Sequence, residues 1–402
     1  MDSYRQVSPF DEGTHFDYVV EGSRGGIVRR GEKLGPEAMR EIACRGIDFT
    51  GIVEPPCDSP RFVPEKFPLQ GFSSAEVHPP PYYAITGVLA RGMVAAGLTS
   101  DLFTAARLVG ILWLGLGLLV MWYAGRELGI SAAPLAAVVA AIAGTPTLLH
   151  ASATVTNDTT GLVTGGLLVW ITLRWERGAS PLWLLGLASF LAVAFKTTNI
   201  LGVGVCAVYL LLRSRRSEGP AHRAGKRSGM IMLTGAAMLS AAAWFVIHAI
   251  LATPVVVPIP GAAGELRLLD VVENLTTLIT PVSYGLPTDA LGTPPYWALG
   301  GILGVLVLGA TVYPVLRGTF SERWERLAGS AGLTMLLGGG LFAVGSYFLY
   351  GNVTVSARYG LSLIPVLGVA LAAAIRWRPA LWGLWVFAVG QLALVLSALV
   401  SA

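Results

Sequence analysis

Charged residues are scarce in this chain of 402 residues. They make up 13% of the sequence, with 28 Lys and Arg and 24 Asp and Glu, while hydrophobic residues make up 54%. Soluble domains carry about 25% charged residues and fewer apolar ones. The shortage of charge, with a mean hydropathy of +0.64, excludes an ordinary soluble domain. It predicts a protein integral to the lipid bilayer, and we expect no nucleic-acid partner.

Cysteine is also rare, with three residues in the chain. This number excludes a small scaffold held together by several disulfides. Cys206 lies in an apolar stretch, whereas Cys44 and Cys57 share the polar N-terminal segment. An oxidising compartment would permit these two to pair, but their presence in one long segment does not establish the bond, and the sequence leaves the question open.

Long apolar stretches recur from residue 104 to the C-terminus. A helix needs about 20 apolar residues to cross about 30 Å of hydrocarbon. We predict ten spans, near residues 104–124, 132–149, 158–174, 181–195, 198–213, 230–252, 296–317, 328–350, 358–376 and 380–400. The expected fold is an all-α polytopic membrane protein in two parts. Residues 1–103 form an extracytoplasmic first loop, and residues 104–402 form a transmembrane helical bundle with an extracytoplasmic loop at 253–295.

Basic residues predict the orientation of the bundle. The segment between the spans at 198–213 and 230–252 holds Arg213, Arg215, Arg216, Arg223, Lys226 and Arg227 against the single acid Glu218. Positively charged short loops stay in the cytoplasm, and alternation then places residues 1–80 outside. Because no apolar signal segment precedes these residues, we expect a first spanning helix upstream of Met1. The alternative is translocation of the polar segment without one.

The apolar stretch at 82–98 is predicted to lie on the outer leaflet. It follows His78-Pro79-Pro80-Pro81-Tyr82-Tyr83, is interrupted by Arg91 and ends before Asp101. If it crossed the bilayer, every later loop would change sides and the basic segment would face outward, against the charge rule.

Polar residues from distant segments are predicted to meet at the outer face. The first loop contributes Asp11, Glu12, His15, Asp17, Glu76 and His78, and the span ends contribute Thr156-Asn157-Asp158, Lys196-Thr197-Thr198-Asn199 and Ser356-Arg358-Tyr359. The loop at 253–295, with Glu265, Arg267, Asp270, Glu273, Tyr284 and Asp289, could cover them. Ionisable groups at the edge of a membrane protein usually mark its functional site. We expect a roofed cavity open to the outer leaflet.

Short motifs in a fixed order carry a family resemblance. They are Phe10-Asp11-Glu12-x-x-His15-Phe16, the His78–Tyr83 run, Thr156-Asn157-Asp158, Phe195-Lys196-Thr197-Thr198, and Ala357-Arg358-Tyr359-Gly360-Leu361-Ser362-Leu363-Ile364-Pro365. Together they resemble the C-type (GT-C) membrane glycosyltransferases, in particular the protein O-mannosyltransferases and bacterial enzymes that use polyprenyl-phosphate sugars. The resemblance implies a GT-C fold, whose first extracytoplasmic loop carries juxtamembrane helices. It also implies a hexosyl- or pentosyltransferase of cell-envelope glycan biosynthesis in the plasma membrane.

The resemblance also implies residue roles. A sugar would pass from a polyprenyl-phosphate donor to a hydroxyl of a glycan, lipid or protein acceptor, with inversion. Asp11 would be the general base, with Glu12 beside it, and Lys196, Arg358 and Tyr359 would bind the donor phosphate. His15, His78, Asn157 and Asp158 would position the acceptor or the sugar. His15, Glu12 and Asp158 could instead hold a divalent cation, so no cofactor is firmly implied and a metal stays open.

Simpler interpretations exist for several of these residues. Asn157 and Asp158 would serve only as a helix cap, and Lys196 and Arg358 would only reach toward the headgroups. His78 would be a polar residue before a proline turn, and Asp17 a solvated loop acid. A transporter or flippase of lipid-linked sugar is the alternative function. A transporter should show internal repeats and acids within its spans, neither of which is evident, and a flippase would not need Asp11.

Overall fold

The computed structural model describes residues 5–9, 11–48, 53–212, 220–253, 267–275, 277–279, 281–282, 294–318, 320–350 and 355–401. Several residues of the predicted segments lie outside this set, namely Phe10, Arg213, Arg215, Arg216, Glu218, Glu265, Tyr284 and Asp289. Within the described residues the regular structure is helical, and extended pairing is limited to the isolated bridges Val7–Ile47 and Lys33–Phe72. The predicted all-α class is confirmed.

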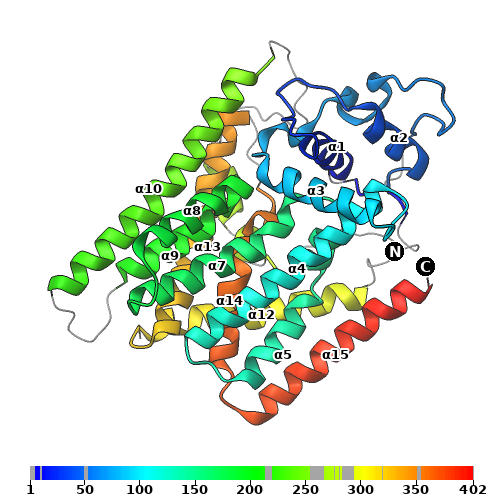
Figure 1. Ribbon diagram of the computed structural model, residues 1–402. Coiled ribbons are helices and arrows are strands. Elements are labelled where there is room, and N and C mark those ends of the chain that lie inside the picture. Colours follow the sequence, from blue (N-terminus) through cyan, green and yellow to red (C-terminus); the bar gives the residue numbers. More distant parts are fainter. Residues whose placement is uncertain are drawn as a thin grey trace.

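The N-terminal part is a small helical unit that covers one end of the bundle (Figure 1). Its elements are α1 (Glu12–Gly22), α2 (Pro36–Arg45), η1 (Pro64–Lys66), η2 (Pro68–Gly71), η3 (Ser74–Val77) and α3 (Pro81–Ala95). Helices α1 and α3 approach closely, since a Cβ added at Gly87 would lie 2.6 Å from the Val19 carbonyl oxygen. The rings of Tyr18 and Tyr83 stack between the two helices with centroids 4.0 Å apart.

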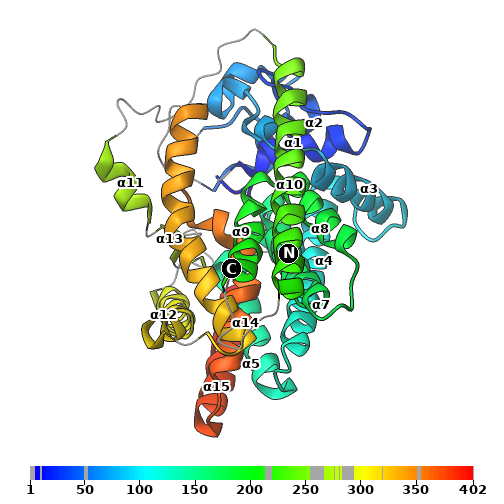
Figure 2. The same cartoon turned by 90° about the vertical axis from the view of Figure 1, so that its left-hand side faces the viewer.

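The remaining elements form the bundle. They are α4 (Leu102–Glu127), α5 (Ala132–Ala143), α6 (Pro146–Ala153), η4 (Asn157–Thr159), α7 (Thr160–Glu176), α8 (Leu182–Phe195), η5 (Thr197–Asn199), α9 (Ile200–Leu211), α10 (Pro220–Leu251), α11 (Leu268–Leu275), η6 (Thr277–Ile279), α12 (Pro294–Arg317), α13 (Arg323–Tyr350), η7 (Ala357–Leu363), α14 (Ile364–Ala374) and α15 (Arg378–Ser401). In the view turned by 90°, α10 and α13 run toward the end of the bundle that the N-terminal unit covers (Figure 2).

Each of the ten predicted spans contains a helix, but not all are long single helices. Among the described residues, six helices are long and apolar enough to cross a membrane, so the protein is a multi-pass membrane protein. The predicted span at 132–149 is instead two helices, α5 and α6, that meet at 62°. Pro146 explains the break, because proline disfavours helical backbone at the residue before it, and Thr145 is extended.

Three helices beside the site are short. Helices α7, α8 and α9 have 17, 14 and 12 residues, which correspond to about 18–26 Å of rise against about 30 Å of hydrocarbon. Polar residues stand where these helices begin or end, at Asp158, Lys196 and Asn199, and all three are buried. Because these helices are short, the polar residues at their ends lie buried within the bundle.

The opposite end of the bundle gathers another set of charges. Arg177 Nη1 lies 2.7 Å from Glu127 Oε1, and Arg326 Nη2 lies 3.2 Å from Glu176 Oε1. Trp183 in the first turn of α8 and Trp377 just before α15 lie at this same end. They are 63% and 70% exposed, as expected for aromatic side chains at a membrane–water interface. The predicted alternation assigns all of these residues to the cytoplasmic side.

Candidate active site

Asp11 stands at the N-terminus of α1, where the N-terminal unit meets the bundle. Its backbone is left-handed, with φ 62° and ψ 2°, a conformation that Asp tolerates better than most residues. Ser74 Oγ donates to Asp11 Oδ1 at 2.8 Å, and Thr14 Oγ1 donates to the Asp11 carbonyl at 2.8 Å. The side chain of Asp11 remains 38% exposed, so this carboxylate is held in place and is still accessible.

Arg358 brings the N-terminal unit and the bundle together. It lies in η7, which leads into α14. Its Nη2 lies 3.3 Å from Asp11 Oδ2, and its Nη1 lies 3.6 Å from Asp158 Oδ2. One guanidinium thus contacts two carboxylates, because its planar fork presents several N–H groups in different directions.

Asp158 and Lys196 form a buried ion pair beneath Arg358. Their side chains are 3% and 4% exposed. Thr156 supplies the helix cap, since its hydroxyl accepts from the Asp158 amide at 3.3 Å. The interpretation of Asp158 as only a cap is therefore wrong, and so is that of Lys196 as a side chain reaching for headgroups. The ring of Tyr359 lies beside both cations, 5.4 Å from Lys196 Nζ and 5.9 Å from the guanidinium carbon of Arg358.

Two histidines form an uncharged layer next to this cluster. The rings of His15 and His78 stack with centroids 5.4 Å apart, and His15 Nδ1 lies 2.7 Å from the Tyr83 hydroxyl. Burial lowers the pKa of His15 to about 3; Asp158 opposes this shift, while Lys196 and Arg358 reinforce it. Burial likewise lowers the pKa of His78 well below its usual value. Both imidazoles are therefore neutral at physiological pH and offer hydrogen bonds rather than charge.

Glu12 is fully engaged in a different interaction. Its carboxylate receives Arg107 Nε at 2.8 Å and Nη2 at 2.7 Å, and the amides of Ser8 and Val155 at 2.7 and 2.8 Å. Glu12 is 1% exposed. It is next to Asp11 in sequence, but its oxygens bind the start of α4 and the segment before η4. Sequence reasoning missed Arg107, although an arginine inside an apolar stretch was the available signal.

The carboxylates of Asp17 and Glu76 also accept hydrogen bonds from backbone amides. Asp17 is buried and accepts from the Gly35 amide at 2.8 Å, at the N-terminus of α2. Burial raises its pKa to about 7, the Gly35 hydrogen bond opposes the rise, and nearby glutamates add to it. Glu76 accepts from the Gly31 amide at 2.9 Å. The interpretation of Asp17 as a solvated loop acid is therefore wrong.

Several buried polar atoms near the charged cluster have no hydrogen-bond partner among the described residues. They are both side-chain atoms of Asn157, Nδ1 of His78, Oγ1 of Thr198 and Oγ of Ser356. Asn157, Thr198 and Ser356 lie within two residues of Asp158, Lys196 and Arg358, respectively. The ring of His78 stacks on that of His15. Buried polar groups are normally paired, so an unpaired group calls for an explanation. A buried water or a polar ligand would supply the missing partner.

A divalent cation does not fit the residues as they are arranged. Within the described part of the chain, no group of three or more His, Cys, Asp or Glu residues could hold a metal ion. Of the three ligands considered from the sequence, Glu12 binds Arg107 and Asp158 binds Lys196. We derive no step through a metal.

Part of the predicted roof packs beside the segment that carries Arg358. Helix α11 and the short η6 pack against α13, and η6 also contacts η7, which carries Arg358. Asn274 Oδ1 accepts from the Val355 amide at 3.0 Å, so this part of the predicted loop lies close to the site.

Cys44 and Cys57 form a disulfide that ties the end of α2 to the segment after it.

Comparisons with known proteins give a distant structural likeness. No protein-family model matches the chain, and no curated protein matches it. Among solved structures the chain is similar to the crystal structure of ArnT from Cupriavidus metallidurans in the apo state, with 17% sequence identity and a TM-score of 0.48. The match covers 94% of this chain and 57% of that chain, less than two thirds of ArnT. At this identity and TM-score the likeness assigns no role to any residue.

Proposed function

We propose that the protein is a membrane glycosyltransferase that moves a sugar from a polyprenyl-phosphate donor to the hydroxyl of an acceptor at the extracytoplasmic face. The observation that carries the proposal is the position of Arg358 between Asp11 and Asp158, with Lys196 behind them. An accessible carboxylate and two cations within one buried cluster are what an attack on a sugar phosphate requires: a base for the nucleophile and positive charge for the leaving group.

Asp11 is assigned the role of general base. It accepts the proton of the acceptor hydroxyl while the acceptor oxygen forms a bond to the anomeric carbon of the sugar. The bond between that carbon and the phosphate oxygen breaks, and the electron pair stays on the phosphate. Attack from the face opposite the leaving group inverts the configuration. The proton on Asp11 then passes to water, which restores the carboxylate.

Arg358 and Lys196 are assigned to the donor phosphate. Negative charge grows on the leaving phosphate as the bond breaks, so cations at this position stabilise the transition state more than the ground state. Arginine holds phosphate through two parallel N–H groups, whereas lysine acts as a compact charge. A donor phosphate that binds Arg358 competes with Asp11 for the guanidinium. Donor binding would therefore break the Arg358–Asp11 contact and leave the carboxylate able to accept a proton.

The neutral residues and Asn157 are assigned to positioning. His15, His78 and Tyr359 would contact the sugar or the phosphate, and the unpaired atoms of Asn157 would find partners in the donor. Glu12 takes a supporting role here instead of the catalytic one expected from the sequence, because Arg107 and two amides already occupy its oxygens.

Transfer from radiolabelled polyprenyl-phosphate sugars, measured with the purified protein in lipid nanodiscs, tests the proposal. We expect Asp11→Asn to lower turnover by about 10²–10⁴-fold, the usual contribution of a general base, while donor binding persists. Asp58→Asn is the matched control, because Asp58 is an exposed acid of the same N-terminal unit. If Asp11→Asn keeps its activity, or if no donor is consumed by the wild type, the assignment is wrong. Translocation of lipid-linked sugar that survives Asp11→Asn would favour a flippase.

A further inference from the structure

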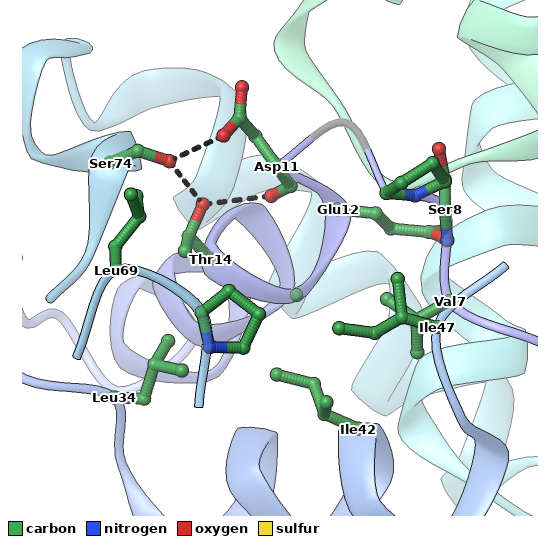
Figure 3. Close-up of a pocket in the computed structure, with 13 residues that line it drawn as sticks. Val7, Ser8, Asp11, Glu12, Thr14, Leu34, Ile42, Ile47, Leu69 and Ser74 are labelled. Carbon is green, nitrogen blue, oxygen red and sulfur yellow. Dashed lines mark hydrogen bonds between the residues drawn. The ribbon is translucent and has the colours of Figure 1, made fainter. Parts of the chain in front are cut away.

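A cavity of about 400 Å³ opens in the N-terminal unit; Asp11 lines it and Arg358 does not. Figure 3 shows Asp11, Thr14 and Ser74 at one edge and Val7, Leu34, Ile42, Ile47 and Leu69 around the rest of the wall. The cavity is formed by α1, α2 and the segments beside them. The bundle cations of the candidate active site do not line it.

Aliphatic side chains form most of the cavity wall, which carries no positive charge. None of its lining residues is basic or aromatic. Its acids are Asp11 and Glu12, and Glu12 is neutralised by Arg107. An anionic ligand would face the carboxylates of Asp11 and Glu12 with no cation on the cavity wall, whereas an uncharged aliphatic group would gain from leaving water.

The polar edge of the cavity has three oxygen–oxygen contacts and two hydroxyl groups that can donate. Three contacts of 2.8 Å join Asp11 Oδ1 to Ser74 Oγ, Ser74 Oγ to Thr14 Oγ1, and Thr14 Oγ1 to the Asp11 carbonyl. With Asp11 ionised, only the two hydroxyl protons are available for these three contacts, because a hydroxyl donates one hydrogen bond. One proton delivered to the Asp11 carboxylate at Oδ1 would complete the chain, since Ser74 could then donate to Thr14 and Thr14 to the carbonyl.

We propose that this cavity binds the acceptor, an uncharged molecule with an aliphatic group next to its reacting hydroxyl. The inference rests on the proposed function and deepens it. The aliphatic group lies against Ile42, Ile47 and Leu69, and the hydroxyl approaches Asp11 from the edge that Ser74 and Thr14 form. The proton that the acceptor gives to Asp11 completes the hydroxyl chain, so Ser74 and Thr14 are positioning residues for proton transfer. Asp11 separates this acceptor side from the donor side at Arg358.

Photolabelling tests acceptor binding without requiring turnover. The probe is an octanol that carries a diazirine, and octanoate with the same diazirine is its charged counterpart. We expect the alcohol to label peptides that contain residues 34–47 and 68–74, at least fivefold more than the carboxylate at pH 8. Ile47→Trp, which fills the cavity, should lower this labelling at least fivefold, and Val53→Trp, at an exposed position of the same unit outside the cavity, should leave it unchanged. Equal labelling by both probes, or labelling that Ile47→Trp does not alter, would overturn the proposal.

Kinetics with a transferring donor separate this proposal from the proposed function. Ile47→Trp should raise the acceptor KM about tenfold and leave the donor KM unchanged. Ser74→Ala should lower kcat about tenfold without changing the alcohol labelling. Ser74→Thr should restore most of the wild-type kcat, because this variant keeps a hydroxyl. If the wild type consumes no donor, the proposed function fails. If it consumes donor while Ile47→Trp leaves the acceptor KM unchanged, only the acceptor cavity fails. A Tm of Ile47→Trp close to that of the wild type verifies folding.

Discussion

Arg358 Nη2 lies 3.3 Å from Asp11 Oδ2, although 347 positions separate the two residues in the chain. This contact joins the N-terminal unit to the segment before α14, and it places the accessible carboxylate next to a cation. In the proposed function, the same guanidinium holds the base before the donor arrives and the phosphate afterwards.

Replacement of Arg358 by lysine tests the importance of this fork. Arg358→Lys keeps one positive charge but loses the planar pair of N–H groups, so we expect the donor KM to rise about tenfold, equivalent to about 1.4 kcal/mol. Arg376→Lys, at an exposed ion pair with Glu322, is the control and should behave as the wild type. An unchanged donor KM in Arg358→Lys would remove Arg358 from the donor site.

The pair of Glu12 and Arg107 should matter for stability. Both side chains are buried, at 1% and 6% exposure, so Arg107→Ala leaves a carboxylate without its counter-charge. The expected loss is about 3–5 kcal/mol in the free energy of unfolding, measured by denaturation in detergent micelles. Arg177→Ala removes an exposed partner of Glu127 and should cost below about 1 kcal/mol. A similar loss in both variants would argue against a structural role for the buried pair.

Asp17 should make stability fall as pH rises. Burial raises the pKa of its carboxyl from the ordinary 3.8 to about 7. Between these values the unfolded chain has lost this proton and the folded protein keeps it, so unfolding releases a proton and higher pH favours unfolding. The expected slope is about 1.4 kcal/mol per pH unit, and it ends above pH 7.

Asp17→Asn removes this titration and keeps an oxygen that can accept from the Gly35 amide. Thermal denaturation between pH 4 and pH 8 should therefore show a smaller fall in Tm for Asp17→Asn than for the wild type. The exposed acid Asp58 supplies the control variant, Asp58→Asn, which should keep the wild-type slope. Equal slopes in Asp17→Asn and the wild type would contradict the prediction.

The cysteines test the predicted orientation of the N-terminal unit. Cys44 and Cys57 are exposed and joined in a disulfide, and Cys206 is buried in the bundle. In intact cells, a maleimide too large to cross the membrane should label the protein only after treatment with an impermeant reductant. Cys44→Ser leaves Cys57 unpaired and should be labelled without reductant. Labelling that requires cell lysis in both cases would place the N-terminal unit in the cytoplasm and make the proposed orientation wrong.

The all-α class and the approximate positions of the helices could be predicted from the sequence, and so could the segments that meet at the candidate site. Hydropathy over about 20 residues is a local property, and so are the motifs around Asp11, Asp158, Lys196 and Arg358. The bend between α5 and α6 was also visible locally, at Pro146, but a continuous apolar stretch hid it. The short lengths of α8 and α9 likewise follow from the polar residues between them.

Side-chain partners could not be predicted in this way. Neighbouring acids in the first motif have different surroundings, since Asp11 faces Arg358 and Ser74 while Glu12 faces Arg107. The left-handed backbone at Asp11 and the start of α1 directly after it turn the two side chains apart. Nothing in the order of residues ties position 12 to position 107 or position 11 to position 74.

Composition and the length of the apolar stretches by themselves determined that this chain is a helical membrane protein with most of its polar residues near the ends of its spans, because the cost of placing charge in hydrocarbon acts on each segment separately. The tertiary structure alone decided which acid is accessible, which is buried in an ion pair, and that an aliphatic cavity lies beside Asp11. Those outcomes depend on how α1, α2, α4 and η7 pack against one another, and packing joins residues whose separation along the chain carries no information about their distance in space.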